Sequence, residues 1–152
     1  MGMLRTLQDS AFSAWVLGSD SIWSYPTILT LHTVGLAILV GAALIIDLRL
    51  LGFGAGIPVS ALERLYPLVW TGFAINLASG VVLFVVQAAD RIAQPVFLLK
   101  LGFIAVAFGT TLAIRRHVSA GDRSAVRLRG SAAASLVCWA GAIVAGRLMA
   151  YL

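Results

Sequence analysis

Cysteine is almost absent from this 152-residue sequence, and charged side chains are scarce. The single cysteine, Cys138, has no CxxC or CxxCH motif around it, which excludes an intrachain disulfide, a cysteine-rich zinc site and covalently attached c-type haem. Only 11% of the residues are charged, whereas 61% are hydrophobic. Because ordinary soluble domains are only about 45 to 50% apolar, the composition predicts an integral membrane protein.

Carboxylates are also in short supply. Asp and Glu number six against eleven Lys and Arg, which gives a formal net charge of +5. The basic residues lie between apolar runs and do not line one soluble face. Membrane topology therefore explains them better than nucleic acid, which we exclude as a partner.

Four apolar runs are long enough to cross a bilayer, which takes about 20 residues each. The expected spans cover residues 24–47, 65–89, 92–115 and 130–151. Residues 3–19 instead place apolar side chains on one face of a helix and polar side chains on the opposite face. This pattern is typical of an amphipathic helix lying in the membrane interface. The predicted fold is all-α: one membrane domain, residues 1–152, built as a four-helix bundle with an N-terminal interfacial helix.

The arginines give the bundle a direction. One side carries Arg49, Arg64, Arg115, Arg116, Arg123, Arg127 and Arg129, and the other side has Arg5, Arg91 and Arg147 on or near it. By the positive-inside rule, the arginine-rich side faces the cytoplasm and both termini face outward. With no signal peptide or other targeting signal, this predicts a multi-pass protein of a bacterial inner membrane with periplasmic termini.

Two ionisable side chains fall inside the apolar runs, His32 in the first and Lys100 in the third. Such residues cost about 2.5 to 3.5 kcal/mol at mid-helix, so they are candidates for function. At about 1.5 Å of rise per residue they lie roughly 13 and 10 Å below the outer boundary. Two structural alternatives stay open, a hydrogen-bonded histidine and a lysine that snorkels to the interface. Asn76, in the second run, is expected to make an interhelical hydrogen bond.

The cations inside the spans have no carboxylate beside them. Asp47 is expected to close the first span as an ordinary helix end, paired locally with Arg49. Arg147, near the C-terminus, adds to this excess of positive charge. The excess indicates that the spans bind an anionic partner. Haem b would offer its iron to His32, which would be the metal ligand, and propionates or a second coordination position to Lys100 and Arg147. A quinone, an acidic porphyrin or a lipid headgroup are the alternatives.

Two further residues bear on this expected cofactor site. Gly35 lies beside the His32 face, where a small residue leaves space for a flat ligand or for close approach of another helix. His117 follows Arg115 and Arg116 at the inner boundary and is expected to be an interfacial cation. It is too far along the third span to join His32 on one iron within a monomer.

Two segments resemble a known family. They are similar to segments of the quinone-linked protoporphyrinogen oxidases and of the related copper-resistance-D-like membrane domains. The first segment runs from Leu31-His32 through Gly41 to Asp47-Leu48-Arg49-Leu50-Leu51, and the second is Leu99-Lys100-Leu101. In the oxidase family a histidine on helix one and a lysine on helix three are functional and associated with b-type haem. The resemblance, which covers two of the four spans, implies these roles for His32 and Lys100.

The leading interpretation is a membrane b-type haem protein that transfers electrons between a periplasmic partner and the quinone pool. One alternative is a non-catalytic subunit or scaffold, motivated by a small-residue stripe at Ala134, Cys138, Ala142 and Gly146. Another is an enzyme resembling protoporphyrinogen oxidase. Besides the lipid bilayer, the expected partners are a membrane or periplasmic protein or further copies of this chain.

Overall fold

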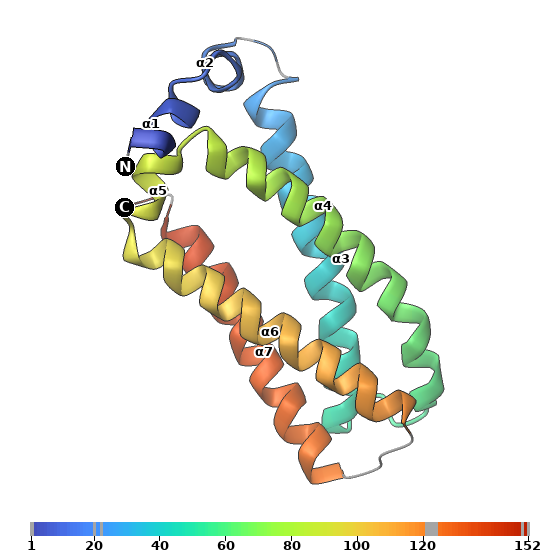
Figure 1. Ribbon diagram of the computed structural model, residues 1–152. Helices are drawn as coiled ribbons and strands as arrows, with labels where there is room; N and C mark the ends of the chain where they lie inside the picture. Colours follow the sequence, from blue (N-terminus) through green and yellow to red (C-terminus); the bar gives the residue numbers. More distant parts are fainter. Residues whose placement is uncertain (1, 20, 22, 121–124, 150, 152) are drawn as a thin grey trace. The chain divides into compact units, whose positions relative to one another are not determined.

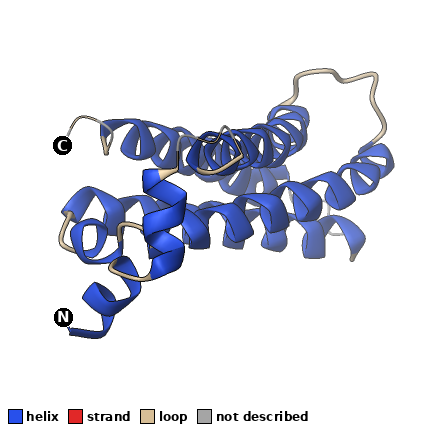
Figure 2. Cartoon of the chain, turned by 90° about the horizontal axis from the view of Figure 1, so that it is seen from above, coloured by secondary structure: helices blue, strands red, loops and turns tan. Residues whose placement is uncertain are grey.

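The computed structural model describes residues 2–19, 21, 23–120, 125–149 and 151, and every regular element in these ranges is a helix (Figure 2). The elements are α1 (Gly2–Gln8), α2 (Ala11–Gly18), α3 (Tyr25–Leu51), the 3-10 helix η1 (Val59–Leu65), α4 (Tyr66–Val85), α5 (Ala88–Ile92), α6 (Pro95–Ser119) and α7 (Ala125–Leu148) (Figure 1). Of the arginines used above to orient the bundle, Arg123 lies outside the described residues.

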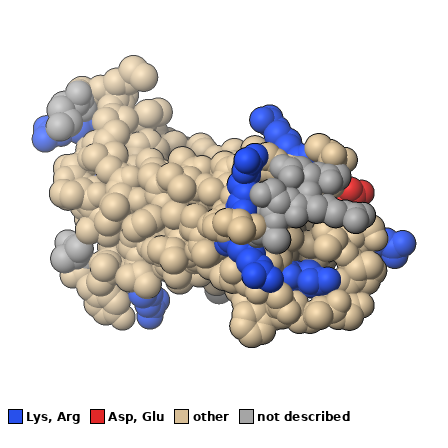
Figure 3. All heavy atoms as spheres, turned by 90° about the horizontal axis from the view of Figure 1, so that it is seen from below, with Lys and Arg blue, Asp and Glu red and all other residues tan. Residues whose placement is uncertain are grey.

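Four helical segments are long and apolar enough to cross a membrane, which confirms the all-α membrane bundle. They are Tyr25–Leu51, Val59–Val85, Pro95–Ser119 and Val126–Leu148. Large apolar side chains remain exposed along them, among them Leu77, Leu98 and Val137. Figure 3 shows wide stretches of surface without a charged group. Such surfaces suit a lipid environment, where exposed apolar groups cost nothing.

Several helix boundaries differ from the expected ones, and α6 ends at Ser119 and α7 begins at Ala125, beyond the expected limits of the third and fourth spans. The interfacial segment is two short helices, because the Ser10 side chain accepts a hydrogen bond from the Ser13 N–H and starts α2 anew. The second span ends at Val85, since Gln87 leaves helical geometry before α5. α3 continues one turn past residue 47 to Leu51, so Asp47 lies inside the helix.

The chain divides into two compact units. The first contains Met1–Leu39 and Trp70–Pro95, and the second contains Val40–Val69 and Val96–Leu152. α3 and α4 each contribute one part to either unit, while α1, α2 and α5 belong to the first and α7 to the second. His32 and Gly35 therefore belong to the first unit, and Lys100 and Arg147 belong to the second.

In the first unit, α3 and α4 touch through bare backbone at two glycines. A Cβ added to Gly72 would lie 2.5 Å from the Leu39 nitrogen, and one added to Gly35 would lie 2.7 Å from the Asn76 nitrogen. Neither position can hold a larger residue without moving the helices. Glycine pairs of this kind let helices approach closely in lipid, where no hydrophobic force drives them together.

The N-terminal helices join the first unit through one amide side chain. Gln8, at the end of α1, donates from Nε2 to Asp90 Oδ2 (3.0 Å) and accepts at Oε1 from the Ala89 N–H (2.9 Å). Both partners lie in the first turn of α5, where backbone N–H groups lack helical acceptors. Gln8 therefore ties α1 to α5, and these two helices lie side by side in Figure 1.

In the second unit, α6 and α7 pack antiparallel. The Phe103 ring covers Gly141, where an added Cβ would lie 2.8 Å from the ring. The buried face of α7 is Ala132, Ser135, Trp139, Ala142 and Ala145. This face differs from the small-residue stripe expected from the sequence: it shares Ala142 with it, but Ala134 is exposed.

We predict that Gly72→Ala destabilises the protein by about 1 to 3 kcal/mol, because the new methyl group would overlap the α3 backbone. Gly41→Ala is the matched control: nothing lies within 4 Å of its added Cβ, and alanine is the better helix former. Unfolding of both variants in detergent, followed by circular dichroism, measures the difference. Equal midpoints would contradict the close contact.

Candidate functional site

His32 lies on the α3 face that meets α4 in the first unit. Its Nδ1 is 3.0 Å from the main-chain carbonyl oxygen of Asn76 and 3.1 Å from Ser79 Oγ. A carbonyl oxygen can only accept, so Nδ1 carries the proton and donates it. When the imidazole is neutral, this leaves the lone pair on Nε2, and the neutral ring is the form in which histidine ligates metals.

Asn76 returns a hydrogen bond to the same residue. Its Nδ2 donates to the main-chain carbonyl of His32 at 2.9 Å, so the two residues link α3 and α4 in both directions. The expected interhelical hydrogen bond of Asn76 is thereby confirmed. The Ser79 hydroxyl donates to the Ile75 carbonyl at 2.6 Å, which leaves its oxygen lone pairs directed to His32 Nδ1. The sequence did not indicate Ser79 as a partner, because only the pairing of α3 with α4 brings it there.

Glycines set the distance at which this hydrogen-bonded group forms. A Cβ on Gly80 would lie 3.1 Å from His32 Cε1, so the imidazole edge packs on the α4 backbone. Gly35 is buried one turn further along α3, against Asn76 and Gly72. Of the two uses that the sequence left open for Gly35, the structure shows the close approach of another helix.

Lys100 and Arg147 belong to the second unit. The end of the Lys100 side chain lies over Gly146 of α7, with Nζ 3.6 Å from the position of an added Cβ. Arg147, the next residue, places its guanidinium carbon 5.7 Å from the centre of the Tyr151 ring, within the range of a cation–π contact. The structure thus brings Lys100 to the turn of α7 that carries Arg147.

The expected pairing of Asp47 with Arg49 is wrong. Arg49 donates instead to the main-chain carbonyls of Ile57 (2.6 Å) and Ala55 (3.2 Å), and so holds the loop that follows α3. Asp47 is buried inside the second unit. Its place in the chain was a signal that could have shown this, because it follows Leu39 by eight residues and Ala43 by four, on the buried face of α3.

Asp47 has polar neighbours that are buried with it. Asp47 Oδ2, Tyr66 Oη, Ser135 Oγ and Trp139 Nε1 are all enclosed, and none has a hydrogen-bond partner among the described residues. Arg115 of α6 lies over the Tyr66 ring, with its guanidinium carbon 5.3 Å from the ring centre. These four unsatisfied atoms distinguish the second unit from the first, where His32, Asn76 and Ser79 bond to one another.

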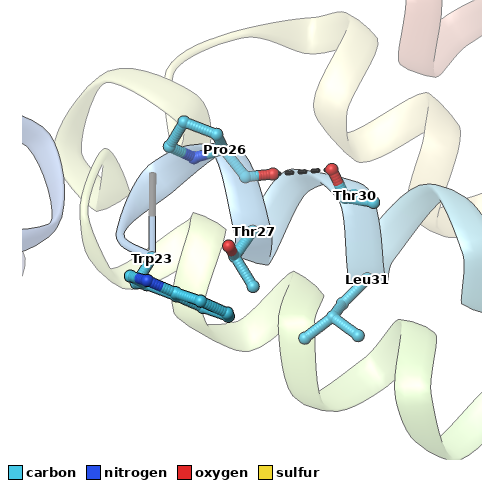
Figure 4. Close-up of a pocket in the computed structure, with 5 residues that line it drawn as sticks. All are labelled: Trp23, Pro26, Thr27, Thr30 and Leu31. Carbon is cyan, nitrogen blue, oxygen red and sulfur yellow. Dashed lines mark hydrogen bonds between the residues drawn. The ribbon is translucent and has the colours of Figure 1, made fainter. Parts of the chain in front are cut away.

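A shallow hollow of about 260 Å³ opens at the start of α3. Its walls are Trp23, Pro26, Thr27, Thr30 and Leu31 (Figure 4). The Thr30 hydroxyl is turned to its own helix, where it donates to the Pro26 carbonyl at 2.8 Å. His32 is not among the lining residues, so this hollow is separate from the imidazole and is suited to an apolar chain more than to a polar ligand.

The protein offers few side chains that could ligate a metal ion. Within the described part of the chain, no group of three or more His, Cys, Asp or Glu side chains could hold a metal ion. A metal at His32 would therefore need most of its ligands from a cofactor, as iron has in haem. Comparison with family models, with curated proteins and with solved structures finds no match to this chain.

Proposed function

We propose that this chain is a b-type haem protein of the membrane, with His32 Nε2 as an axial ligand, and that it passes electrons between a periplasmic partner and the quinone pool. The observation that carries the proposal is the hydrogen bond from His32 Nδ1 to the Asn76 carbonyl. Histidines that ligate metals nearly always donate the other ring N–H to a carbonyl or carboxylate, which fixes tautomer and ring orientation. Bound haem would supply an iron that accepts and releases one electron.

Charge supports the same proposal. Haem brings carboxylate propionates into a protein whose spans contain the cations Lys100 and Arg147. Lys100 is half-buried, and the end of its side chain lies over the bare backbone of Gly146. An acidic ligand would lower the cost of these cations in the bundle.

A second candidate function has an observation of its own. The reciprocal bonds between His32 and Asn76, with the glycine contact beneath them, suffice to hold α3 against α4. A histidine used only in this way would fit a membrane subunit or scaffold without a cofactor. The two functions differ in one measurable property, which is whether the purified protein carries haem.

We predict that the protein purified from haem-replete cells shows the Soret and α bands of b-type haem in a reduced-minus-oxidised spectrum. His32→Ala should abolish these bands, because it removes the axial nitrogen. His117→Ala is the matched histidine control and should leave them, since His117 lies near the end of α6, at the expected inner boundary of the membrane.

Asn76→Ala separates the two uses of His32. The acceptor for Nδ1 is the main-chain carbonyl of Asn76, which this change preserves, so the haem bands should persist. Stability should fall by about 0.6 to 2 kcal/mol through loss of the side-chain bond to His32. A wild-type protein without haem bands would reject the haem function and favour the scaffold.

We further propose that the membrane is the bacterial inner membrane and that both termini face the periplasm. The support is the concentration of arginines in and around η1, at the end of α6 and at the start of α7, as the positive-inside rule describes. In this orientation the His32 half of α3 lies toward the periplasm.

The orientation predicts which engineered thiols react in intact cells. In a Cys138→Ser background, Met3→Cys should react with a membrane-impermeant maleimide once the outer membrane is permeabilised, because Met3 is highly exposed in α1. Ser119→Cys, at the exposed end of α6, should react only after lysis. The reverse pattern would refute the proposed topology.

A further inference from the structure

The second unit encloses polar groups that no part of the described chain satisfies. Asp47 is 1% exposed, Tyr66 3%, Ser135 0% and Trp139 2%, and each has a polar side-chain atom without a hydrogen bond. Buried polar atoms in folded proteins are almost always bonded to protein or to ordered water. Leaving even one such group unsatisfied costs about 1 to 3 kcal/mol.

These groups come from three different segments and are neighbours. The Ser135 hydroxyl adjoins the Asp47 carboxyl, although their geometry falls short of a hydrogen bond. Tyr66 lies within electrostatic range of Asp47. Trp139 follows Ser135 by one helical turn on the buried face of α7. Two segments, the start of α4 and the buried face of α7, therefore contribute unsatisfied atoms to the same unit as Asp47.

The four atoms have complementary hydrogen-bonding capacities. The indole Nε1–H of Trp139 can only donate, and an ionised Asp47 can only accept, while the hydroxyls of Tyr66 and Ser135 can do either. A water molecule donates two hydrogen bonds and accepts two, and buried waters usually make about three. One water can thus accept from Trp139 and Tyr66 and donate to Asp47 and Ser135, which leaves none of the four atoms unsatisfied.

We propose that Asp47, Tyr66, Ser135 and Trp139 form a binding site for an internal water molecule that joins α3, α4 and α7. A bare monovalent cation fits less well, because it would use the three oxygens and leave the Trp139 N–H without an acceptor. The guanidinium of Arg115 over Tyr66 also disfavours a second cation there. The bound water gives the otherwise unbonded Asp47 oxygen a donor inside the bundle. Ionisable groups at such positions mark ion and proton pathways in membrane proteins.

The test is the sign of a stability change. Tyr66→Phe and Ser135→Ala each remove a hydroxyl and almost no volume. If the hydroxyls bind a shared water, each change should lower the thermal unfolding midpoint of the full-length protein, and the double variant should differ from the sum of the single effects. Tyr151→Phe, which removes an exposed tyrosine hydroxyl, is the matched control and should leave the midpoint unchanged.

Each other result overturns the proposal. A raised midpoint in Tyr66→Phe or Ser135→Ala would mean that the hydroxyl is truly unbonded, so that its removal relieves a penalty. Lowered but additive midpoints would mean separate partners and no shared molecule.

Two further measurements on the full-length protein distinguish a bound water from a bound cation. Internal water gives an O–H stretching band that shifts in heavy-oxygen water, and this band should be present in the wild type and lost in the double variant. The midpoint should also be equal in sodium, potassium and choline chloride. A rise in sodium or potassium alone would assign the site to a cation instead, because a ligand that binds the folded state stabilises it.

Discussion

The contact of bare backbone between Gly35 on α3 and Gly72 on α4 is the constraint on which the first unit depends. Helices in lipid gain nothing from burying apolar surface against each other, so close packing and polar bonds must hold them together. Because neither glycine presents a side chain, the helices approach until the His32 and Asn76 hydrogen bonds can close. A larger residue at either position would separate the helices and break both bonds.

The second unit solves the same problem by side-chain packing. Trp139, Ile46 and Leu62 are almost fully buried, and the Phe103 ring fills the notch that Gly141 leaves on α7. Its polar groups do not satisfy one another as those of the first unit do. Arg49 holds the loop after α3 through the carbonyls named above. Gly52 also shapes this loop: its φ of 112° is a conformation that glycine adopts readily, and it allows the Phe53 N–H to donate to the Leu48 carbonyl. The buried polar side chains of the first unit thus bond to one another, whereas four buried polar atoms of the second unit have no hydrogen-bond partner among the described residues.

The four spans were predictable because hydropathy and length are local properties of the chain. The hydrogen bond of Asn76 was predictable in kind, since a polar side chain in an apolar run must find a partner, but the identity of that partner depends on which helices pair. Asp47 was misjudged for the same reason. Its nearness to Arg49 in sequence suggested local pairing, whereas the fold turns Arg49 to loop carbonyls and Asp47 into the bundle. Helical spacing from Ala43 carried the correct signal and was outweighed by the adjacent charge.

The hydrogen bonds by which His32 holds α3 to α4 do not compete with the metal ligation that we propose for it. The bond that the imidazole donates employs Nδ1 and a main-chain acceptor, so the fold itself fixes the tautomer. Ligation employs Nε2, and it would require neither a new tautomer nor the loss of the bond to Asn76. A ligand held in its working orientation before the metal arrives loses less entropy on binding. Several polar side chains could donate to the Asn76 carbonyl; what imidazole adds is a second nitrogen with a basic lone pair. That chemical difference is the reason to look for iron at this position.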